Sequence, residues 1–344
     1  MDDMGRCWGI LPNVSRSFAL CIRILPSPLN SQMMLSYLVF RVIDTVEDSH
    51  APLDAKKGMF AEFLSLLSRR KADDAASAAC AGKMLAGLNY TYEKELLEAL
   101  PSLVRAYSSL PTGARKAILK RARVMARGMC EFQEKGIETF ADQDRYSYYV
   151  AGIIGHLFND LLEFNRIITS ALKRQLSKYA RQFGLALQKV NILRDIADDI
   201  SAHRYYWPKR LLAKYGLDYQ SICSSENREK ALAVLQEQIK DARGYIDAAM
   251  QYIMLLPKNA LQVRMFCLIP LFMAIESYVK CVGNADVFVS GKKVKISREQ
   301  VGDIVAKSGM WGSDNQRLAQ WFSASMGHVP GGIGDFSIVP SRAR

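Results

Sequence analysis

The stretch from residue 183 to 208, FGLALQKVNILRDIADDISAHRYYWP, constrains the fold of this 344-residue chain more than any other. Its first half has apolar residues at helical spacing and is expected to be buried. Its second half places Asp195, Asp198 and Asp199 at positions i, i+3 and i+4, on one face of one predicted helix. Like charges at this spacing repel one another, so carboxylates at the end of a buried helix need a partner or a cation.

A second stretch repeats this arrangement. The apolar helical pattern LSYLVFRVIDTVED ends with Asp44, Glu47 and Asp48, and Arg41 precedes them by about one turn. One acidic cluster alone would be weak support for a metal site. Two clusters of the same spacing indicate a pair of facing acidic patches that hold divalent metal ions.

Composition narrows the class of partner and of compartment. The net charge of +12 suits an anionic partner, such as nucleic acid, an acidic membrane surface or a phosphorylated substrate. The basic run at 115–127 has no interleaved aromatic residues, so we do not expect nucleic acid. Seven scattered cysteines without a CxxC motif fit free thiols in a reducing compartment, and four histidines without ligand spacing argue against zinc.

We expect a soluble protein that rests on a membrane. The first residues, MDDMGRCWGI, do not read as a signal peptide. The most apolar run, FCLIPLFMAI at 266–275, has half of the roughly 20 residues that a membrane span needs.

Helical patterns dominate, and there is no βαβ alternation, P-loop, GxGxxG or GxSxG motif. The prediction is one all-α domain over residues 1–325, a helical bundle around a central cavity, with a disordered tail at 326–344. Pro101 predicts a kink or break within the helical pattern that begins at Glu93. Residues 71–83 form a loop or a weak helix, and weak alternation at 286–297 allows a small hairpin.

Two short motifs have alternative interpretations. Ser15 and its neighbours Arg16, Ser17 and Phe18 are either a helix N-cap or a phosphate contact. Gly152 and Gly155, three residues apart in a helix, indicate close approach by another backbone or by a ligand. The tyrosines just before these glycines are core residues or site residues.

Several motifs in a fixed order resemble the squalene and phytoene synthase family of head-to-head trans-isoprenyl diphosphate synthases. They are VSRSFAL, YLVFRVIDTVEDS, YVAGIIG, and LALQKVNILRDIADDI with RYYWP, and the resemblance extends over about residues 10–308. The family usually has Glu where Asp198 stands, and often glycine where Ala202 and His203 stand. Within the family, residues 265–281 and 294–300 are most similar to squalene synthases.

The resemblance implies an isoprenoid-synthase fold and Mg²⁺-dependent joining of two farnesyl diphosphates into presqualene diphosphate, followed by reduction to squalene with NADPH. Mn²⁺ is an alternative metal. An enzyme that lacks the reductive step, such as a phytoene, dehydrosqualene or presqualene diphosphate synthase, shares the same metal and phosphate residues. A non-enzymatic helical adaptor using the basic 115–127 face would leave both acidic clusters unexplained.

The resemblance also implies roles for individual residues. Catalytic residues are expected to be Tyr149, Asp44, Asp48, Asp195 and Asp199. Substrate-binding residues are expected to be Ser15, Arg16, Ser17, Phe18, Arg41, Gln188, Asn191, Arg194 and Arg204. Metal ligands are expected to be Asp44, Glu47, Asp48, Asn191, Asp195, Asp198 and Asp199. No residues are assigned to NADPH, and we expect a cytoplasmic monomer that associates peripherally with membranes.

Overall fold

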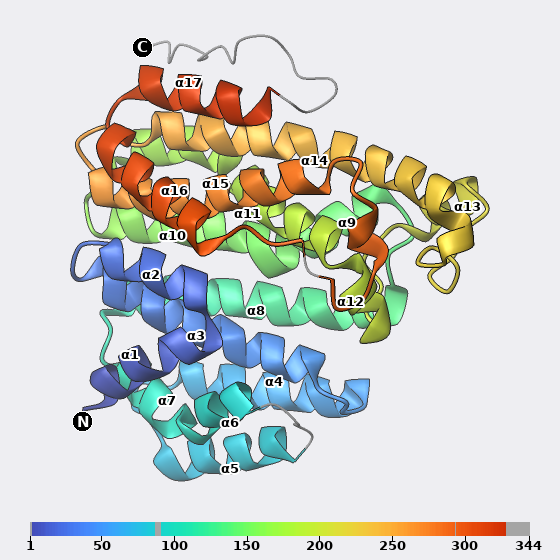
Figure 1. Ribbon diagram of the computed structural model, residues 1–344. Coiled ribbons are helices and arrows are strands. Elements are labelled where there is room, and N and C mark those ends of the chain that lie inside the picture. Colours follow the sequence, from blue (N-terminus) through green and yellow to red (C-terminus); the bar gives the residue numbers. More distant parts are fainter. Residues whose placement is uncertain (1, 87–90, 293, 328–344) are drawn as a thin grey trace. The chain divides into compact units, whose positions relative to one another are not determined.

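The computed structural model describes residues 2–86, 91–292 and 294–327, apart from the side chains of residues 16, 17, 91 and 92. These residues form helices and no strand, which confirms the all-α prediction (Figure 1). The chain divides into two compact units. Unit 1 contains residues 1–134 and 157–170, and unit 2 contains residues 135–156 and 171–344. The single domain expected from the sequence stays a prediction.

Unit 1 is built around the long helix α3, whose C-terminal end bears the first acidic cluster. Its helices are α1 (Asp3–Val14), α2 (Arg16–Ile24), α3 (Leu29–Asp48), α4 (Leu53–Ser68), α5 (Asp74–Leu85), α6 (Thr91–Glu98), α7 (Leu100–Ser108), α8 (Thr112–Lys135) and the part of α10 from residue 157. Leu35, Leu38 and Val42 of α3 are fully buried, and α3 packs against α1 and α7. Each such side chain contributes about 1.5–3 kcal/mol of burial free energy.

Unit 2 contains the second acidic cluster. Its helices are α9 (Phe140–Ser147), η1 (Tyr148–Gly152), α10 (Ile153–Phe164) up to residue 156, α11 (Ser170–Arg194), α12 (Ile196–Ser201), α13 (Lys209–Lys214), η2 (Ser225–Asn227), α14 (Arg228–Leu255), α15 (Leu261–Cys281), η3 (Ala285–Phe288), α16 (Arg298–Trp311) and α17 (Asn315–Met326). α15 packs against α14 and α16, and Tyr278 of α15 donates a hydrogen bond to the Ile239 carbonyl of α14 at 2.9 Å. The buried faces of these helices form the core of the unit.

Several local predictions need correction. The predicted single helix across the second acidic cluster is interrupted: α11 ends at Arg194, and Asp195 has φ −104° and ψ 12° before α12 begins. Of the two alternatives for residues 71–83, the loop is wrong and the helix forms: α5 spans Asp74–Leu85, and the Asp73 side chain caps it by accepting from the Ala76 amide. No strand occurs in the described part of 286–297, where η3 and irregular chain replace the predicted hairpin.

Other local predictions are confirmed. Pro101 coincides with a break, because α6 ends at Glu98 and α7 begins at Leu100. Of the predicted tail, Met326 belongs to α17, whereas residues 328–344 lie outside the described residues.

One described helix, α15, is long and apolar enough to cross a membrane, and 67% of its most apolar window is buried inside the protein. A core helix of a soluble protein gives the same result. All seven cysteines are free thiols, and five of them are buried.

Candidate active site

The first acidic cluster lies at the C-terminal end of α3 in unit 1. One face of this end is buried through Val42, Ile43 and Val46, which leaves the carboxylates partly accessible. Arg41 donates a hydrogen bond to Asp44 at 2.7 Å and another to Glu93 of α6 at 2.6 Å. Burial alone would lower the pKa of Arg41, but these carboxylates raise it above its ordinary value. Arg41 is therefore a fixed cation at the edge of the cluster.

Negative charge is in excess at this helix end. Burial, together with the nearby Asp48 and Asp44 carboxylates, raises the pKa of Glu47 to about 8. The C-terminus of a helix is itself the negative end of the helix dipole, which adds to the repulsion. The Glu47 carbonyl accepts hydrogen bonds from Lys56 at 2.6 Å and from Gln133 at 2.9 Å. A divalent cation would relieve the remaining repulsion.

The start of α2 meets the same helix one turn earlier. Ser15 is the N-cap of α2, and its hydroxyl accepts from the Phe18 amide at 3.2 Å, so the capping interpretation holds. The ring of Phe18 stacks on Tyr37 of α3, with centroids 6.0 Å apart. The Arg16 and Ser17 side chains lie outside the described residues. The phosphate role of this motif stays a prediction.

The second acidic cluster follows α11 in unit 2. Arg194 donates two hydrogen bonds to Asp195, at 2.7 and 2.5 Å. Arg204 forms an ion pair with Asp199 at 3.3 Å. Asp198 accepts from the Gly291 amide at 3.0 Å and from the Ser290 hydroxyl at 3.3 Å.

The turn before Arg204 departs from ordinary backbone geometry. His203 has φ 57°, a left-handed conformation that favours glycine. This explains why glycine suits this part of the motif. Arg204 nevertheless pairs with Asp199, so the departure from the family pattern preserves the contact.

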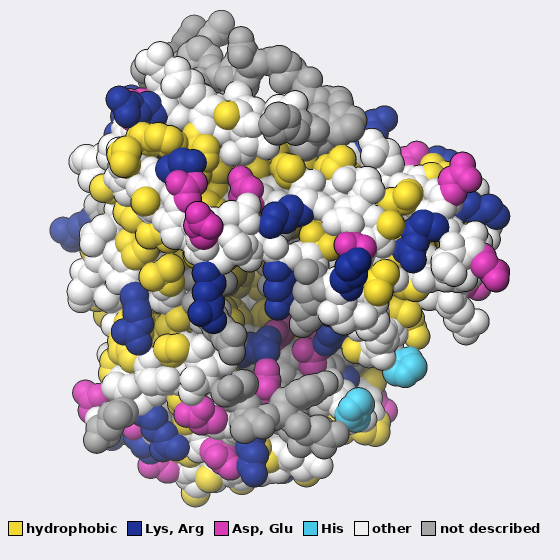
Figure 2. Space-filling view, viewed as in Figure 1, with side chains coloured by type: hydrophobic (Ala, Val, Ile, Leu, Met, Phe, Trp, Pro, Cys, Tyr) yellow, Lys and Arg dark blue, Asp and Glu magenta, His cyan; other side chains and the backbone are white. Residues whose placement is uncertain are grey.

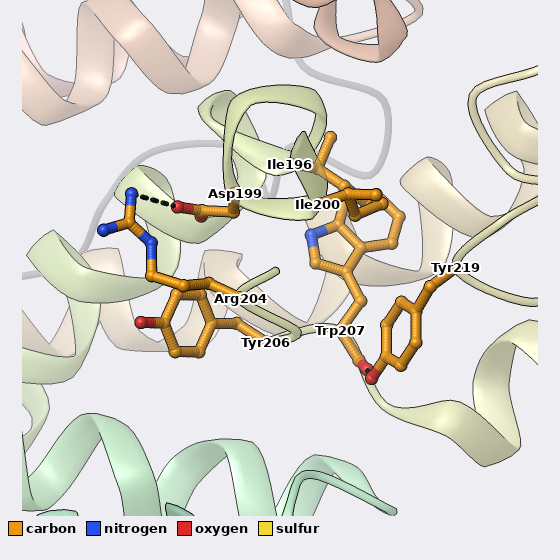
Figure 3. Close-up of a pocket in the computed structure, with 7 residues that line it drawn as sticks. All are labelled: Ile196, Asp199, Ile200, Arg204, Tyr206, Trp207 and Tyr219. Carbon is orange, nitrogen blue, oxygen red and sulfur yellow. Dashed lines mark hydrogen bonds and ion pairs between the residues drawn. The ribbon is translucent and has the colours of Figure 1, made fainter. Parts of the chain in front are cut away.

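The recess beside the second cluster is small (Figure 3). Its lining consists of Ile196, Asp199, Ile200, Arg204, Tyr206, Trp207 and Tyr219, and it holds about 180 Å³ of space open to solvent. The side chains leave no room in it for even the centre of a water molecule, whereas small-molecule sites usually measure about 300–1,000 Å³. Trp207 donates to the Ile192 carbonyl at 3.0 Å, which fixes the RYYWP segment to the end of α11. The recess thus borders the phosphate-binding candidates but is too small for a whole prenyl chain.

Tyr149 lies in a π-helical turn, η1, that coincides with the YYVAG motif. Such turns are rare and are frequently found at functional sites. Tyr149 is 7% exposed, and Arg145 donates to its hydroxyl at 3.3 Å. The Arg145 guanidinium also lies 5.9 Å from the centre of the Tyr149 ring. The ring is therefore placed where it already meets a positive charge.

The glycines of this motif allow helix backbones to touch. A Cβ atom on Gly155 would lie 2.1 Å from the Ala180 carbonyl oxygen of α11. A Cβ atom on Gly184 of α11 would lie 2.3 Å from the Ala151 carbonyl oxygen. Of the two alternatives in the sequence, a neighbouring backbone rather than a ligand explains Gly155.

Both clusters offer donors that suit Mg²⁺, which prefers oxygen ligands. Among the described residues, no three acidic, histidine or cysteine side chains already converge on one point. Asp44, Asp195 and Asp199 each contact an arginine instead. The excess negative charge around Glu47 is the observation that fits a metal best. The ligand assignments stay predictions.

Two further predicted site residues lie on α11, before the second acidic cluster. Gln188 is half-buried and Asn191 exposed on α11, within two turns before Asp195. Sequence reasoning missed Glu93, which holds Arg41, and the contact of Ser290 and Gly291 with Asp198. It also missed buried Lys189, although a lysine within the apolar part of α11 could have indicated a buried charge.

Known proteins resemble this chain over most of its length. The squalene synthase LSS of Botryococcus braunii is 33% identical over 298 residues, which cover 85% of this chain and 61% of that protein. The squalene synthase of Schizosaccharomyces pombe is 31% identical over 315 residues, which cover 89% of this chain and 65% of that protein. The chain thus spans less than two thirds of the length of these relatives.

Solved structures give the same result. The structure of TcSQS in complex with a ligand matches with a TM-score of 0.84 and 30% identity, covering 96% of this chain and 93% of that one. A dehydrosqualene synthase in complex with a ligand matches with a TM-score of 0.60 and 18% identity, which concerns the fold alone. The squalene/phytoene synthase family matches residues 11–300. This chain therefore belongs to the squalene/phytoene synthase family.

Proposed function

We propose that the chain is a squalene synthase, which joins two farnesyl diphosphates into presqualene diphosphate and reduces this product to squalene with NADPH. The observation that supports this most is the arginine–aspartate pairing at both acidic helix ends, in a chain similar to squalene synthases. At each helix end, the aspartates can bind a cation and the neighbouring arginine can bind an anion. A metal–diphosphate unit needs both.

The first step requires that diphosphate leave an allylic carbon. Bound Mg²⁺, or Mn²⁺ in its place, would supply Lewis-acid stabilisation of the leaving group. Its proposed ligands are Asp44, Glu47, Asp48, Asn191, Asp195, Asp198 and Asp199. The arginines that now pair with aspartates, Arg41, Arg194 and Arg204, would bind phosphate oxygens through charge-assisted hydrogen bonds. Gln188 and the Ser15–Phe18 motif would complete the phosphate site.

The resulting carbocation must be protected from water. Tyr149, buried in η1, would present its ring face to the cation or its hydroxyl to a departing proton. The second farnesyl chain attacks through its double bond, and the cyclopropane of presqualene diphosphate forms as a proton leaves. A closed apolar site favours this path over hydrolysis.

The reductive step distinguishes this proposal from its closest alternative. NADPH would supply a hydride to the rearranged cation. The squalene-like segments 265–281 and 294–300 correspond to α15 and the start of α16 with its capping box, Ser297 and Gln300. If the enzyme lacked reduction, it would be a phytoene, dehydrosqualene or presqualene diphosphate synthase.

We further propose peripheral contact with an anionic membrane on the cytoplasmic side. Lys116, Lys120, Arg123 and Arg127 of α8 are exposed and recur at i, i+4, i+7 and i+11, so they form one stripe, the α8 stripe. Arg121 does not belong to it, because it pairs with Asp160 at 2.7 Å. On the face drawn in Figure 2, Lys and Arg side chains are scattered among acidic and apolar ones. The helical spacing, rather than a general patch, therefore supports this surface.

Product analysis tests the function directly. Purified protein would be incubated with Mg²⁺ and either farnesyl or geranylgeranyl diphosphate, with and without NADPH, and the products identified by mass spectrometry. We expect presqualene diphosphate or unreduced hydrocarbons from farnesyl diphosphate alone, and squalene once NADPH is added. The same product profile with and without NADPH would instead support a non-reducing synthase.

A further inference from the structure

Lys189 of α11 is a charged residue enclosed in the interior of unit 2. Its side chain is 2% exposed. Its ammonium group lies 2.6 Å from Asp144 of α9 and also pairs with Asp241 of α14. It donates to the side-chain oxygen of Gln143, on α9, at 3.0 Å. The three donors of one ammonium group therefore reach two different helices.

The network extends beyond these contacts. Tyr245 of α14 donates to Asp144, and its ring lies 4.9 Å from the Lys189 ammonium. Gln143 donates to the Tyr206 carbonyl at 3.0 Å, in the segment that follows the second acidic cluster. Lys189 thus joins α11 directly to α9 and α14, and Gln143 extends the network to the RYYWP segment.

Stability alone does not require a charge at this place. An apolar replacement for a buried ionic network is often neutral or stabilising, whereas an ionic network imposes directional contacts. Burial raises the pKa of Asp241, and Lys189 counteracts this effect. An apolar residue at this position would not make directional contacts, so it would not fix the orientation of the helices in the same way.

The geometry of α11 shows what this constraint would control. Gln188 and Asn191 of α11, and Asp195 directly after it, recur at i, i+3 and i+7, and we call them the ligand face at the end of α11. Lys189 follows Gln188 by one residue, which turns its side chain about 100° away from that face. It lies instead among the buried residues Ala186 and Leu193. Contacts at Lys189 therefore resist rotation of the helix about its own axis.

We propose that Lys189 is a positioning residue, which ties α11 to α9 and α14 and thereby fixes the direction of the ligand face. The inference rests on the proposed function. It does not place Lys189 in contact with metal or substrate. It predicts that loss of the network displaces the ligand face and weakens binding of the metal–diphosphate unit in protein that remains folded.

The experiment compares Lys189→Met and Asp241→Asn with Arg264→Met as a matched control. Arg264 is also a buried cation of unit 2, but it bonds to the Leu256 and Gly312 carbonyls and to Asn315. Calorimetric titration of each folded protein with inorganic diphosphate and Mg²⁺ gives an affinity that does not depend on turnover. Thermal melting and the KM for farnesyl diphosphate are measured in parallel.

We expect Lys189→Met to weaken Mg²⁺–diphosphate binding about tenfold or more, in the range typical of lost outer-shell support for a metal site. Asp241→Asn should also weaken Mg²⁺–diphosphate binding, but by a smaller factor. Arg264→Met should lower the melting temperature and leave the affinity unchanged. The inference is overturned if the Lys189 and Asp241 variants melt earlier but bind like the control.

Two other outcomes of the experiment also decide whether Lys189 is a positioning residue. If Lys189→Met does not fold, the milder Asp241→Asn variant decides by the same titration. If the wild-type protein binds Mg²⁺–diphosphate but turns over no prenyl diphosphate, the proposed function fails, while the titration still supports or overturns the positioning role.

Discussion

Tyr149 has two chemically distinct groups, a ring and a hydroxyl, and both contact Arg145. Tyr149→Phe removes only the hydroxyl, and Tyr149→Ala removes both. A cation–π contact contributes about 0.5–2 kcal/mol, so if the ring acts, turnover should be about 2- to 30-fold higher in the Phe variant than in the Ala variant. The measurement is kcat with farnesyl diphosphate. Equal and severe losses would identify the hydroxyl instead.

Tyr148→Phe is the matched control for this comparison. Tyr148 is the neighbouring residue in η1, and its ring faces Arg181 rather than Arg145. Its hydroxyl should be dispensable. If Tyr148→Phe lowers kcat as much as Tyr149→Phe does, the loss comes from disturbance of the π-helical turn and not from Tyr149 itself.

His203 is the residue at which backbone strain can be tested. A left-handed conformation costs a non-glycine residue about 1–2 kcal/mol, and glycine loses part of this gain through a more flexible unfolded chain. We expect His203→Gly to raise the free energy of unfolding by about 1 kcal/mol or less. Chemical denaturation measures the change.

Arg166 provides the control for this substitution, because it has φ 58° just after α10, in the other unit. Arg166→Gly should stabilise the chain similarly. Only His203→Gly changes the turn before Arg204. A loss of stability at both positions would show that neither backbone is strained.

At the scale of elements, the ends of α3 and α11 have the same arrangement, in which an arginine forms an ion pair with an aspartate. Metal binding would free the arginine, and diphosphate binding would free the aspartate, so each should promote the other. We expect Mg²⁺ to raise the diphosphate affinity at least tenfold, which corresponds to about 1.4 kcal/mol of coupling. Titration calorimetry with each ligand alone and with both together measures this coupling.

Asp195→Asn should remove most of the coupling and reduce turnover by orders of magnitude, and Asp44→Asn should act alike. Asp247→Asn is a suitable control, because Asp247 pairs with Arg243 within α14. It should leave the coupling intact. Diphosphate affinity that does not depend on Mg²⁺ in the wild type would contradict the linked release of the two partners.

The sequence predicts elements well where local chemistry decides them. Ser297 caps α16, because serine followed three residues later by Gln300 forms a capping box that can be recognised in the sequence. The break at Asp195 escaped prediction because helix-like hydrogen bonds continue through it, from the Asp195 amide to Asn191 and from the Asp199 amide to Asp195. Spacing alone does not distinguish one helix from two in that case.

Long-range contacts explain what else was missed at the site. Asp198 accepts a hydrogen bond from the amide of Gly291, which lies 93 residues further along the chain, and no local sequence pattern predicts such a contact. Glu93 and Arg41 are likewise 52 residues apart. The acidic clusters could be predicted because their spacing is local. Their partners could not, because tertiary packing selects them.

At the scale of the whole molecule, the net charge of +12 predicts salt-dependent binding to anionic vesicles. Each basic residue near such a surface contributes about 1 kcal/mol, and the Debye length is only about 8 Å at physiological ionic strength. Replacing the four residues of the α8 stripe by glutamine should therefore abolish most binding in a vesicle sedimentation assay. Binding by the wild type should fall steeply as salt is raised.

The control must remove the same charge elsewhere. Glutamine at the exposed positions Lys230, Lys240, Lys258 and Arg298 also removes four positive charges. If both fourfold variants lose binding equally, net charge rather than the α8 stripe governs the association. Binding that is insensitive to salt would rule out electrostatic docking altogether.

The buried thiols have a practical consequence for spectroscopy. Burial raises the pKa of Cys7, Cys21, Cys80 and Cys281 to about 12. At pH 7 only about one in 10⁵ of each would be the reactive thiolate. A cysteine introduced at an exposed position should therefore accept a maleimide fluorophore ahead of these four. Once the partly exposed Cys130 and Cys223 are replaced by serine, pairs of such labels, one in each unit, would report ligand-induced motion as a change of energy transfer.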